Sequence, residues 1–259
     1  MATLIGNDGD NTLTGTAGAD SINGKSGSDK LTGLAGNDTI LGGEGNDSLN
    51  GGDGKDSLNG GSGNDTIVAG LGNDNLRAGE GDDSLNAGDG SDRLFGDAGN
   101  DTLTGGNGAD TLHGDEGDDL FSAGAGNDIA YGGEGNDTFL GAGGNDFFEG
   151  DEGNDSVDGG GGNDTLIGGV GADMLKGGAG ADVFKWASDD DGDDDDLIAD
   201  FVKGTDKLAI EGFQWGVSGI SYSDGKKTVN FQLDDDSDFD LQINFASSIT
   251  LGANDFVSF

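Results

Sequence analysis

A nine-residue repeat is the feature of this sequence that most constrains its fold. Aspartate recurs every nine residues at nineteen positions, with glycine two residues before each one and, at all but one position, a large apolar residue two residues after it. A chain this regular is predicted to stack its repeats rather than to fold around one central core. The aspartates are Asp20, Asp29, Asp38, Asp47, Asp56, Asp65, Asp74, Asp83, Asp92, Asp101, Asp110, Asp119, Asp128, Asp137, Asp146, Asp155, Asp164, Asp173 and Asp182.

Each unit reads G-G-x-G-(N/D)-D-x-U-x, where U is the apolar residue. The x-U-x part alternates polar and apolar residues, which predicts a very short strand with U facing inward. The glycines predict a tight turn, because they adopt positive φ and let backbones approach closely. One unit cannot bury U alone, but two units per turn stack their U rows into one narrow core. The repeat therefore predicts an all-β, two-faced parallel β-solenoid.

The composition indicates that this chain needs a cation to fold. It has 52 acidic and 11 basic residues, a net charge of −41 and only 31% hydrophobic residues. Such a composition is typical of disordered chains, because too little apolar surface can be buried. The same charge excludes nucleic acid as a partner, and no apolar run approaches the roughly 18 residues of a transmembrane helix. The absence of cysteine excludes disulfides and thiolate metal sites.

Calcium is the cation that the repeat predicts. With two units per turn, loops eighteen residues apart lie over one another, so Asp20 stacks on Asp38. Stacked carboxylates repel, and Ca²⁺ resolves this by accepting about six to eight oxygen ligands in flexible geometry, whereas Mg²⁺ is stricter. Pairing each of the nineteen loops with the loop two units later gives about 17 Ca²⁺ sites, whose charge would offset most of the −41. All nineteen aspartates are predicted metal ligands.

The units at 42–50 and 132–140, which read GGEGNDSLN and GGEGNDTFL, resemble the nonapeptide calcium repeat of RTX (repeats-in-toxin) proteins. The resemblance covers about residues 6–185. It implies a right-handed parallel β-roll with Ca²⁺ between adjacent loops. Early units depart from the pattern, with Thr16, Lys25 and Leu34 in place of the second glycine.

The resemblance also implies a route and a location. RTX proteins leave the cell through a type I secretion system that reads an uncleaved C-terminal signal, so we expect the secretion machinery as a partner. We expect a secreted protein, extracellular or at the cell surface. The first residues have neither a basic start nor an apolar segment, so we do not expect an ordinary secretory signal there.

The nonapeptides stop after Phe184, so we predict a β-roll domain of about twenty repeats over residues 1–185 and a C-terminal β cap with the export signal over residues 186–259. Alternating runs at 219–222, 228–233 and 241–245 predict antiparallel strands, the first two joined by a hairpin at Asp224–Gly225. A cap would cover the open end of the solenoid core.

Two acidic runs and one further aspartate leave alternatives open. The run 189–196 is either an extra calcium loop or a solvated loop, and the run 234–240 lies between two predicted strands and reads as a turn. Asp200 lies eighteen residues after Asp182, so it either completes a last site or coincides with the spacing by chance.

The sequence argues against catalysis. It has one histidine, no cysteine, no G-x-S-x-G and no H-E-x-x-H, so nucleophile–base pairs and zinc sites cannot be assembled. His113 reads as an outward strand residue. We therefore predict a non-enzymatic calcium-binding protein that folds on calcium outside the cell, with a structural, surface-layer, matrix, adhesion or host-contact role. The alternative is the C-terminal calcium-dependent folding and secretion module of a larger enzyme such as a protease, lipase or epimerase.

Outward residues eighteen apart form columns on the predicted solenoid. Phe95, Tyr131, Phe147 and Ile167 lie in or beside one column, which is either a surface for self-association or another partner, or ordinary exposure. Columns of Thr, Ser and Asn on the opposite face raise ice binding as a minor alternative. Lys30, Val68, Leu120 and Leu140 interrupt those columns, which argues against ice binding.

Overall fold

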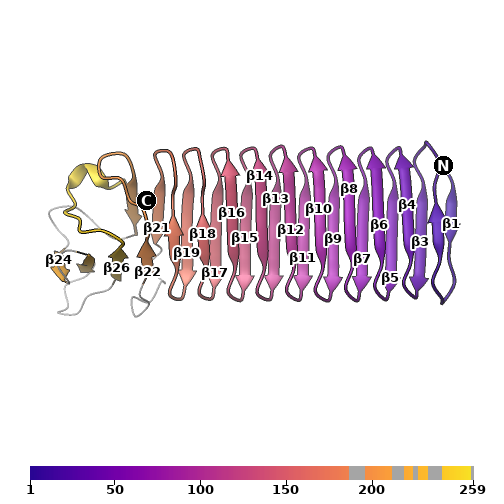
Figure 1. The fold of residues 1–259 in the computed structure, drawn as a ribbon, viewed down its shortest axis with the longest axis horizontal. Helices are drawn as coiled ribbons and strands as arrows, with labels where there is room; N and C mark the ends of the chain where they lie inside the picture. The colour runs from indigo at the N-terminus through magenta and orange to yellow at the C-terminus, as the bar shows by residue number, and fades with distance from the viewer. Residues whose placement is uncertain (187–195, 212–218, 224–226, 233–240, 258–259) are drawn as a thin grey trace. The chain divides into compact units, whose positions relative to one another are not determined.

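In the residues that it describes, the computed structural model contains β-strands and one short 3₁₀ helix (Figure 1). It describes residues 1–259 except 187–195, 212–218, 224–226, 233–240 and 258–259. The chain divides into two compact units, Met1–Glu134 and Gly135–Phe259, and each is described by itself. Within the described residues, no helix has the length and apolar character needed to cross a membrane.

The first unit contains two parallel sheets, with odd-numbered strands in one and even-numbered strands in the other. The first sheet has the order β1 (Thr3–Ile5), β3 (Ser21–Ser26), β5 (Thr39–Glu44), β7 (Ser57–Ser62), β9 (Asn75–Glu80), β11 (Arg93–Ala98), β13 (Thr111–Glu116) and β15 (Ile129–Glu134). The second has the order β2 (Thr12–Thr14), β4 (Lys30–Ala35), β6 (Ser48–Asp53), β8 (Thr66–Leu71), β10 (Ser84–Asp89), β12 (Thr102–Asn107) and β14 (Leu120–Ala125).

The second unit continues this alternation and then changes to antiparallel strands. One sheet has the order β17 (Phe147–Glu152), β19 (Thr165–Val170), β21 (Val183–Trp186) and β23 (Lys207–Ile210). The other has the order β16 (Thr138–Gly143), β18 (Ser156–Asp158), β20 (Met174–Lys176), β22 (Asp196–Ile198), β26 (Leu241–Phe245), β25 (Thr228–Gln232) and β24 (Gly219–Ser223). The 3₁₀ helix is η2 (Ala253–Asp255).

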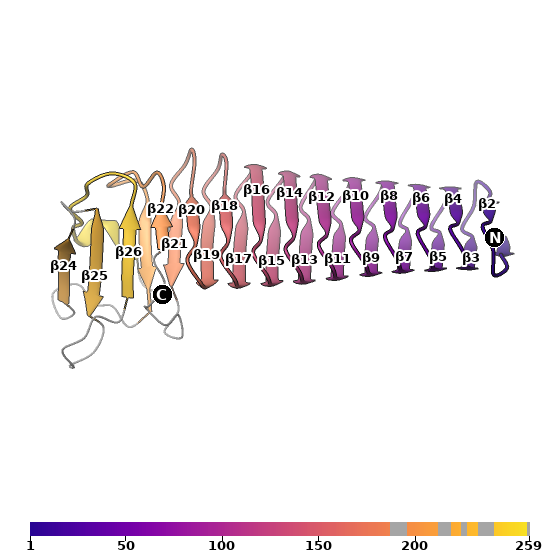
Figure 2. The same cartoon turned by 60° about the horizontal axis from the view of Figure 1, so that its bottom comes forward.

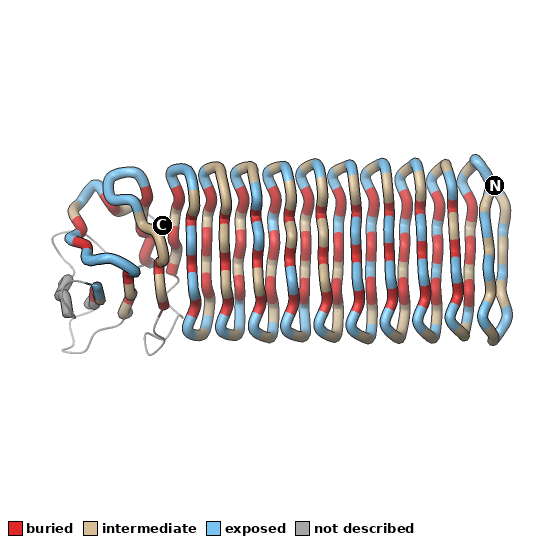
Figure 3. Tube along the Cα trace, viewed as in Figure 1, coloured by how far each residue is buried: buried red, intermediate tan, exposed pale blue. Residues whose placement is uncertain are grey.

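The register stacks equivalent residues of units eighteen apart. Leu49 in β6 lies beside Ile67 in β8, and Leu58 in β7 lies beside Leu76 in β9. These apolar side chains are at most 1% exposed, so each row forms the core between the two sheets. Buried and exposed residues alternate along each strand (Figure 3). The two-faced parallel arrangement that the repeat predicts is therefore observed.

Most repeat strands are longer than the three residues of x-U-x. In β6 (Ser48–Asp53) the strand continues through both glycines of the next unit, and Gly51 is buried like Leu49. The prediction that the glycines belong wholly to the turn was wrong, because the first glycine keeps the alternation and faces the core. The turn is correspondingly shorter, and it ends at the repeat aspartate.

In the C-terminal part of the second unit, further parallel strands are followed by antiparallel strands at the end of one sheet (Figure 2). Strands β22 and β23 pair in parallel with β20 and β21. Strands β24, β25 and β26 pair antiparallel, as predicted from their alternation, whereas the hairpin at 224–225 lies outside the described residues. The fold class is confirmed: an all-β parallel β-solenoid of about 10 turns with antiparallel strands at the C-terminus.

Candidate metal centre

The repeat aspartates are charged groups that lie buried in the protein. Each of the nineteen is at most 4% exposed. In most of them one carboxylate oxygen, Oδ1, accepts a hydrogen bond from the backbone N–H of the aspartate one turn earlier: the Asp47 N–H donates to Asp65 Oδ1 at 2.7 Å, and the Asp137 N–H donates to Asp155 Oδ1 at 2.7 Å. Within each unit the aspartates therefore form ladders that follow the stacked turns.

The other carboxylate oxygen, Oδ2, is buried and has no hydrogen-bond partner in most of these aspartates. Buried polar atoms are nearly always partnered in folded proteins, so a repeated exception indicates a missing ligand. The atoms without a partner include Oδ2 of Asp29, Asp38, Asp47, Asp56, Asp65, Asp74, Asp83, Asp92, Asp101, Asp110, Asp155, Asp164 and Asp182.

A second oxygen lies close to several of these Oδ2 atoms. A methyl group built on Gly42, the first glycine of its unit, would stand 2.3 Å from Asp47 Oδ2 and 2.5 Å from the carbonyl oxygen of Gly60. The same arrangement recurs at Gly60, where the methyl group would meet Asp65 Oδ2 at 2.1 Å and the Ala78 carbonyl oxygen at 2.8 Å. At both glycines a carboxylate oxygen and a carbonyl oxygen therefore lie near the position that a Cβ atom would occupy.

Burial raises the pKa of these carboxyl groups, and the N–H donated to Oδ1 only partly opposes the effect. The pKa rises to about 7 in Asp83 and Asp155. It rises to about 6 in Asp56, Asp65, Asp101, Asp110 and Asp164. Neighbouring carboxylates of the same ladder add to the shift in several of them, for example Asp101 and Asp65 beside Asp83. A nearby cation would favour the ionised form of these groups and lower their pKa.

These residues fit a hard divalent cation. The donor set consists of carboxylate and backbone carbonyl oxygens, which is the set that Ca²⁺ prefers, and it offers no sulfur or imidazole for softer metals. The described residues contain no group of three His, Cys, Asp or Glu side chains that could hold a metal. Ligation here would therefore depend on backbone carbonyls as well as on the aspartates.

A second ladder lies beside the aspartates and was missed in the sequence. The residue before each repeat aspartate is commonly Asn or Asp, and its Oδ1 accepts the N–H of the equivalent residue one turn later. The Asn64 N–H donates to Asn46 Oδ1 at 3.0 Å, and the Asn163 N–H donates to Asn145 Oδ1 at 2.7 Å. The restriction of this position to Asn and Asp was the available signal. These side chains hold the loops in stack without using the repeat carboxylates.

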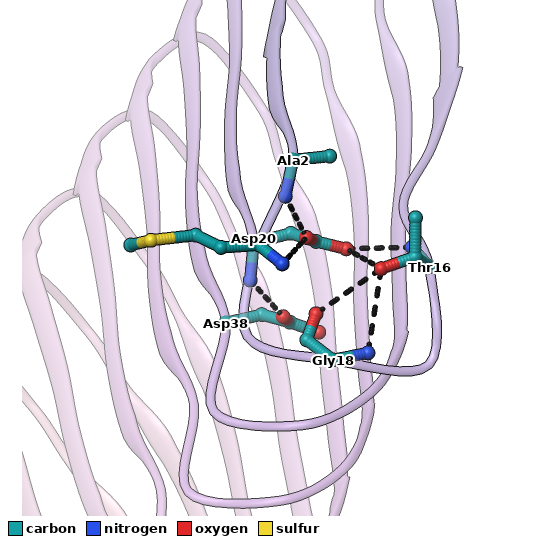
Figure 4. A network of polar contacts seen from close by, with 6 residues as sticks. Ala2, Thr16, Gly18, Asp20 and Asp38 are labelled. Carbon is teal, nitrogen blue, oxygen red and sulfur yellow. Dashed lines mark hydrogen bonds and ion pairs between the residues drawn. The ribbon is translucent and has the colours of Figure 1, made fainter.

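The aspartate at the first complete unit differs from the interior ones. Asp20 Oδ2 accepts the Thr16 N–H at 2.6 Å and the Thr16 hydroxyl at 2.8 Å (Figure 4). Its Oδ1 accepts the Ala2 N–H, and this bond is the largest cause of a lowered pKa in Asp20. Both oxygens of Asp20 are thus satisfied by the protein.

The ladders continue past the last nonapeptide. The Asp173 N–H donates to Asp196 Oδ1 at 2.9 Å, and the Asp182 N–H donates to Asp206 Oδ1 at 3.2 Å. Asp206 rather than Asp200 therefore follows Asp182. The carboxylate of Asp200 instead accepts the N–H groups of two glycines of the last repeats, at 177 and 178. Nothing in the sequence spacing of Asp196 and Asp206 identified them, because both lie beyond insertions that break the period of eighteen.

Protein donors satisfy the second oxygen of both added aspartates. The Trp186 indole N–H donates to Asp196 Oδ2 at 2.6 Å, and Trp186 is only 1% exposed. The Val202 N–H donates to Asp206 Oδ2 at 2.7 Å. Of the acidic run 189–196, only Asp196 lies in the described part of the chain, and the run 234–240 lies outside it.

The outward column of the first unit contains a stack of rings. The rings of Phe95 and His113 lie 4.9 Å apart at 6°, and those of His113 and Tyr131 lie 4.9 Å apart at 15°. The stacked faces cover one another, so the single histidine of the chain is a packed surface residue. Phe147 and Ile167, predicted for the same contact surface, belong to β17 and β19 of the second unit.

Comparison with known proteins identifies the repeats. No curated protein matches the chain. The family model of the RTX calcium-binding nonapeptide repeat matches residues 3–31, 32–67, 59–94, 68–103, 86–121, 95–130, 104–139, 113–148 and 149–184. These segments together run from residue 3 to residue 184, which is well over half of the chain. The chain therefore belongs to the family of RTX calcium-binding nonapeptide repeat proteins, whose repeats bind calcium.

Proposed function

We propose that this protein is a secreted, non-enzymatic calcium-binding protein that folds when calcium binds its buried aspartates. The observation that carries the proposal is the repeated Oδ2 atom that is buried and has no hydrogen-bond partner, in Asp47, Asp83, Asp155 and their equivalents. Without a cation these carboxylates must either be protonated or remain charged in a buried place, and both are unfavourable for folding near neutral pH.

The residues that would hold the ions are the interior repeat aspartates and the carbonyl oxygens beside the first glycines. Bound calcium would supply positive charge and empty coordination positions to both kinds of oxygen. The stoichiometry of about 17 ions stays a prediction from the pairing of loops. Extracellular calcium modules commonly bind with Kd values of about 10⁻⁴ to 10⁻³ M, and we expect that range.

Secretion follows from the family together with this chemistry. A chain that carries a net charge of −41 and needs many ions stays unfolded where calcium is scarce and folds where it is plentiful. This suits export by a type I system and a site of action outside the cell or on its surface. No catalytic family matches the chain, and a binding or structural role is the one we propose.

The ring stack offers a candidate contact surface. Phe95, His113 and Tyr131 are half-buried, which leaves part of each ring accessible on the outer face of the first unit. We propose this face for self-association or a surface partner, and we propose Phe147 and Ile167 of the second unit as further contact residues. Sedimentation in calcium tests it: replacing Phe95, Tyr131 and Phe147 by Ser should lower the association state, and a parent protein that is monomeric at high concentration contradicts self-association.

Far-ultraviolet circular dichroism during a calcium titration tests the main proposal. We expect a cooperative transition from coil to β structure in calcium and none in magnesium, because magnesium demands stricter geometry and dehydrates reluctantly. Bound metal is counted at the end point. A chain that is already folded in chelator at neutral pH, or that binds no calcium, would overturn the proposal.

A further inference from the structure

The residue four positions before each interior aspartate has an unusual backbone. This residue occupies the second glycine position of its unit, and φ is positive there in every unit from Lys25 to Gly178. Glycine adopts this conformation easily, as at Gly43 with φ of 123°. Side-chain-bearing residues adopt it too when they stand at this position: Lys25, Leu34, Asp97, Asp115, Ala142 and Asp151.

Two of the ladder aspartates outside this range, Asp20 and Asp206, have a β-branched residue at the same place. Thr16 stands four residues before Asp20, and Val202 stands four residues before Asp206. Neither is among the described residues with positive φ. Each instead donates its backbone N–H to Oδ2 of its own aspartate, at 2.6 Å and 2.7 Å. Where the residue four positions earlier has positive φ, as at Lys25 and Gly43, the Oδ2 atom of the aspartate has no hydrogen-bond donor. Where φ is not positive, at Thr16 and Val202, a backbone N–H donates to Oδ2.

The physical reason lies in the direction of one peptide N–H. A β-branched side chain disfavours positive φ, because its two γ atoms collide with the neighbouring backbone. The backbone at Thr16 and Val202 therefore keeps an ordinary φ, and the N–H points to the carboxylate. At the interior positions the left-handed conformation turns the peptide, and no N–H reaches Oδ2.

The rest of the pocket at Asp20 matches the interior ones. A methyl group on Gly15 would stand 2.8 Å from Asp20 Oδ2 and 2.7 Å from the Gly33 carbonyl oxygen, close to the values at Gly42. The carbonyl oxygen that lies beside Asp47 Oδ2 and Asp65 Oδ2 therefore has a counterpart at Asp20. The Thr16 donors, together with the N-terminal amine 3.8 Å from Asp20 Oδ1, distinguish this position from an interior one (Figure 4).

We propose that the residue four positions before each aspartate is a backbone gate that decides whether the carboxylate is open to calcium. The gate is open where φ is positive, and it is closed at Asp20 by Thr16 and at Asp206 by Val202. Asp196 is closed by a different donor, the Trp186 indole. Calcium therefore binds the aspartates from Asp29 to Asp182, and Asp20 is a metal-free terminal position. This inference rests on the proposed calcium function of the same row.

Native mass spectrometry of the full chain in saturating calcium tests the gate, because it resolves one ion more or less on a 25.7 kDa protein. Thr16→Gly and Val202→Gly each remove an exposed side chain and allow positive φ, so each is expected to bind one more Ca²⁺ than the parent. Leu34→Val places a β-branched residue at a gate that already carries a side chain, 47% exposed, and is expected to bind one fewer. Leu34→Gly is the matched control and is expected to keep the parent number.

The ion counts distinguish a failure of the proposed gate from a failure of the proposed calcium function. If the parent binds calcium and all four variants bind the same number of ions, the gate is wrong while the calcium function stands. If the parent binds no calcium, the proposed function is wrong. Circular dichroism shows whether each variant folds. Should Leu34→Val fail to fold, the gain of an ion in Thr16→Gly and Val202→Gly still decides, and equal counts there overturn the gate.

Discussion

Carboxylates of the repeats and carboxylates of the C-terminal segment are equally buried, but different groups satisfy them. In the second unit, Asp164 is 1% exposed and its Oδ2 has no partner. Asp255 is also 1% exposed, but its two oxygens accept the N–H groups of Gly204 at 3.0 Å and Gly252 at 2.7 Å. Burial alone therefore does not distinguish a metal-dependent aspartate from a self-sufficient one.

The C-terminal segment also supplies its own cations. Lys207 Nζ donates to the Asn254 carbonyl oxygen at 2.6 Å, and Lys203 Nζ donates to the Thr250 carbonyl oxygen. Near Gly42 and Gly60 of the repeats a backbone carbonyl oxygen lies close to a carboxylate oxygen, whereas here ammonium groups reach the backbone oxygens. In the C-terminal segment, N–H and ammonium groups of the protein satisfy the buried oxygen atoms. In the repeats we propose that a bound ion satisfies them.

The largest expected effect is that of pH on the calcium-free chain. Burial raises the pKa of Asp83 and Asp155 from 3.8 to about 7, so the folded chain binds more protons than the unfolded chain between these values. The stabilisation by protons is complete below about pH 4 and is lost as the pH rises through about 6 to 7. In calcium-free buffer, β structure measured by circular dichroism should therefore increase from pH 7.5 to 4.5.

Saturating calcium should reverse this trend, since protons compete with the ion for the same oxygens. A calcium-free chain whose β content is unchanged between the two pH values would show that the interior carboxylates do not control folding. The terminal carboxylate Asp20, whose pKa is lowered, should contribute in the opposite direction.

Substitution of one interior aspartate should cost the stability contributed by one ion. Asp83→Asn is expected to lower the free energy of unfolding by about 2.7 kcal/mol when free calcium is 100 times Kd, as measured by urea unfolding. Asp82→Asn makes the same change of charge, but the amide keeps the oxygen that accepts the Asn100 N–H, so it should cost little.

Asp255→Asn gives the contrasting case in the C-terminal segment. One of the two N–H groups that Asp255 accepts would face an amide N–H, so the free energy of unfolding should fall by about 1–3 kcal/mol. This loss should not depend on the calcium concentration, whereas the loss in Asp83→Asn should grow with it. Equal calcium dependence in the two variants would contradict the distinction between the regions.

A smaller effect tests the backbone of the repeats without touching a carboxylate. Leu34 has φ of 87°, which is unfavourable for a residue with a side chain. Leu34→Gly should raise the free energy of unfolding in calcium by about 1 kcal/mol, because glycine removes this strain. Leu41→Gly is the matched control: Leu41 is exposed to a similar degree without positive φ, so its loss should destabilise.

The smallest expected effect concerns the ring stack. Phe95→Ser removes one end of the stack with His113 and should cost about 0.5–1.5 kcal/mol beyond the apolar area lost. Val68→Ser removes an apolar side chain of the opposite sheet, 36% exposed, and should cost less. Urea unfolding in calcium measures both. Equal losses would mean that the stacked geometry contributes nothing of its own.

The period of nine residues was sufficient to predict the two sheets and the stacking of units eighteen apart, including the stacked row of aspartates. Leu49 and Ile67 lie side by side because a strict period allows only one register. The closure of Asp196 by Trp186 could not be predicted in this way. Contacts across an insertion depend on the path of the chain, which no local pattern encodes. The only sign of the Asn ladder in the sequence was the preference for Asn or Asp at the position before each repeat aspartate.

Sequence alone determined that this chain is a repeated, calcium-binding β-solenoid, because spacing, glycine and net charge are properties of the chain as written. Only the tertiary structure decided which carboxylates are open. Asp20 and Asp29 stand in the same phase of the repeat, yet Thr16 donates to one and no group donates to Oδ2 of the other. The direction of a single peptide N–H separates them, and that direction becomes visible only when the turns are stacked.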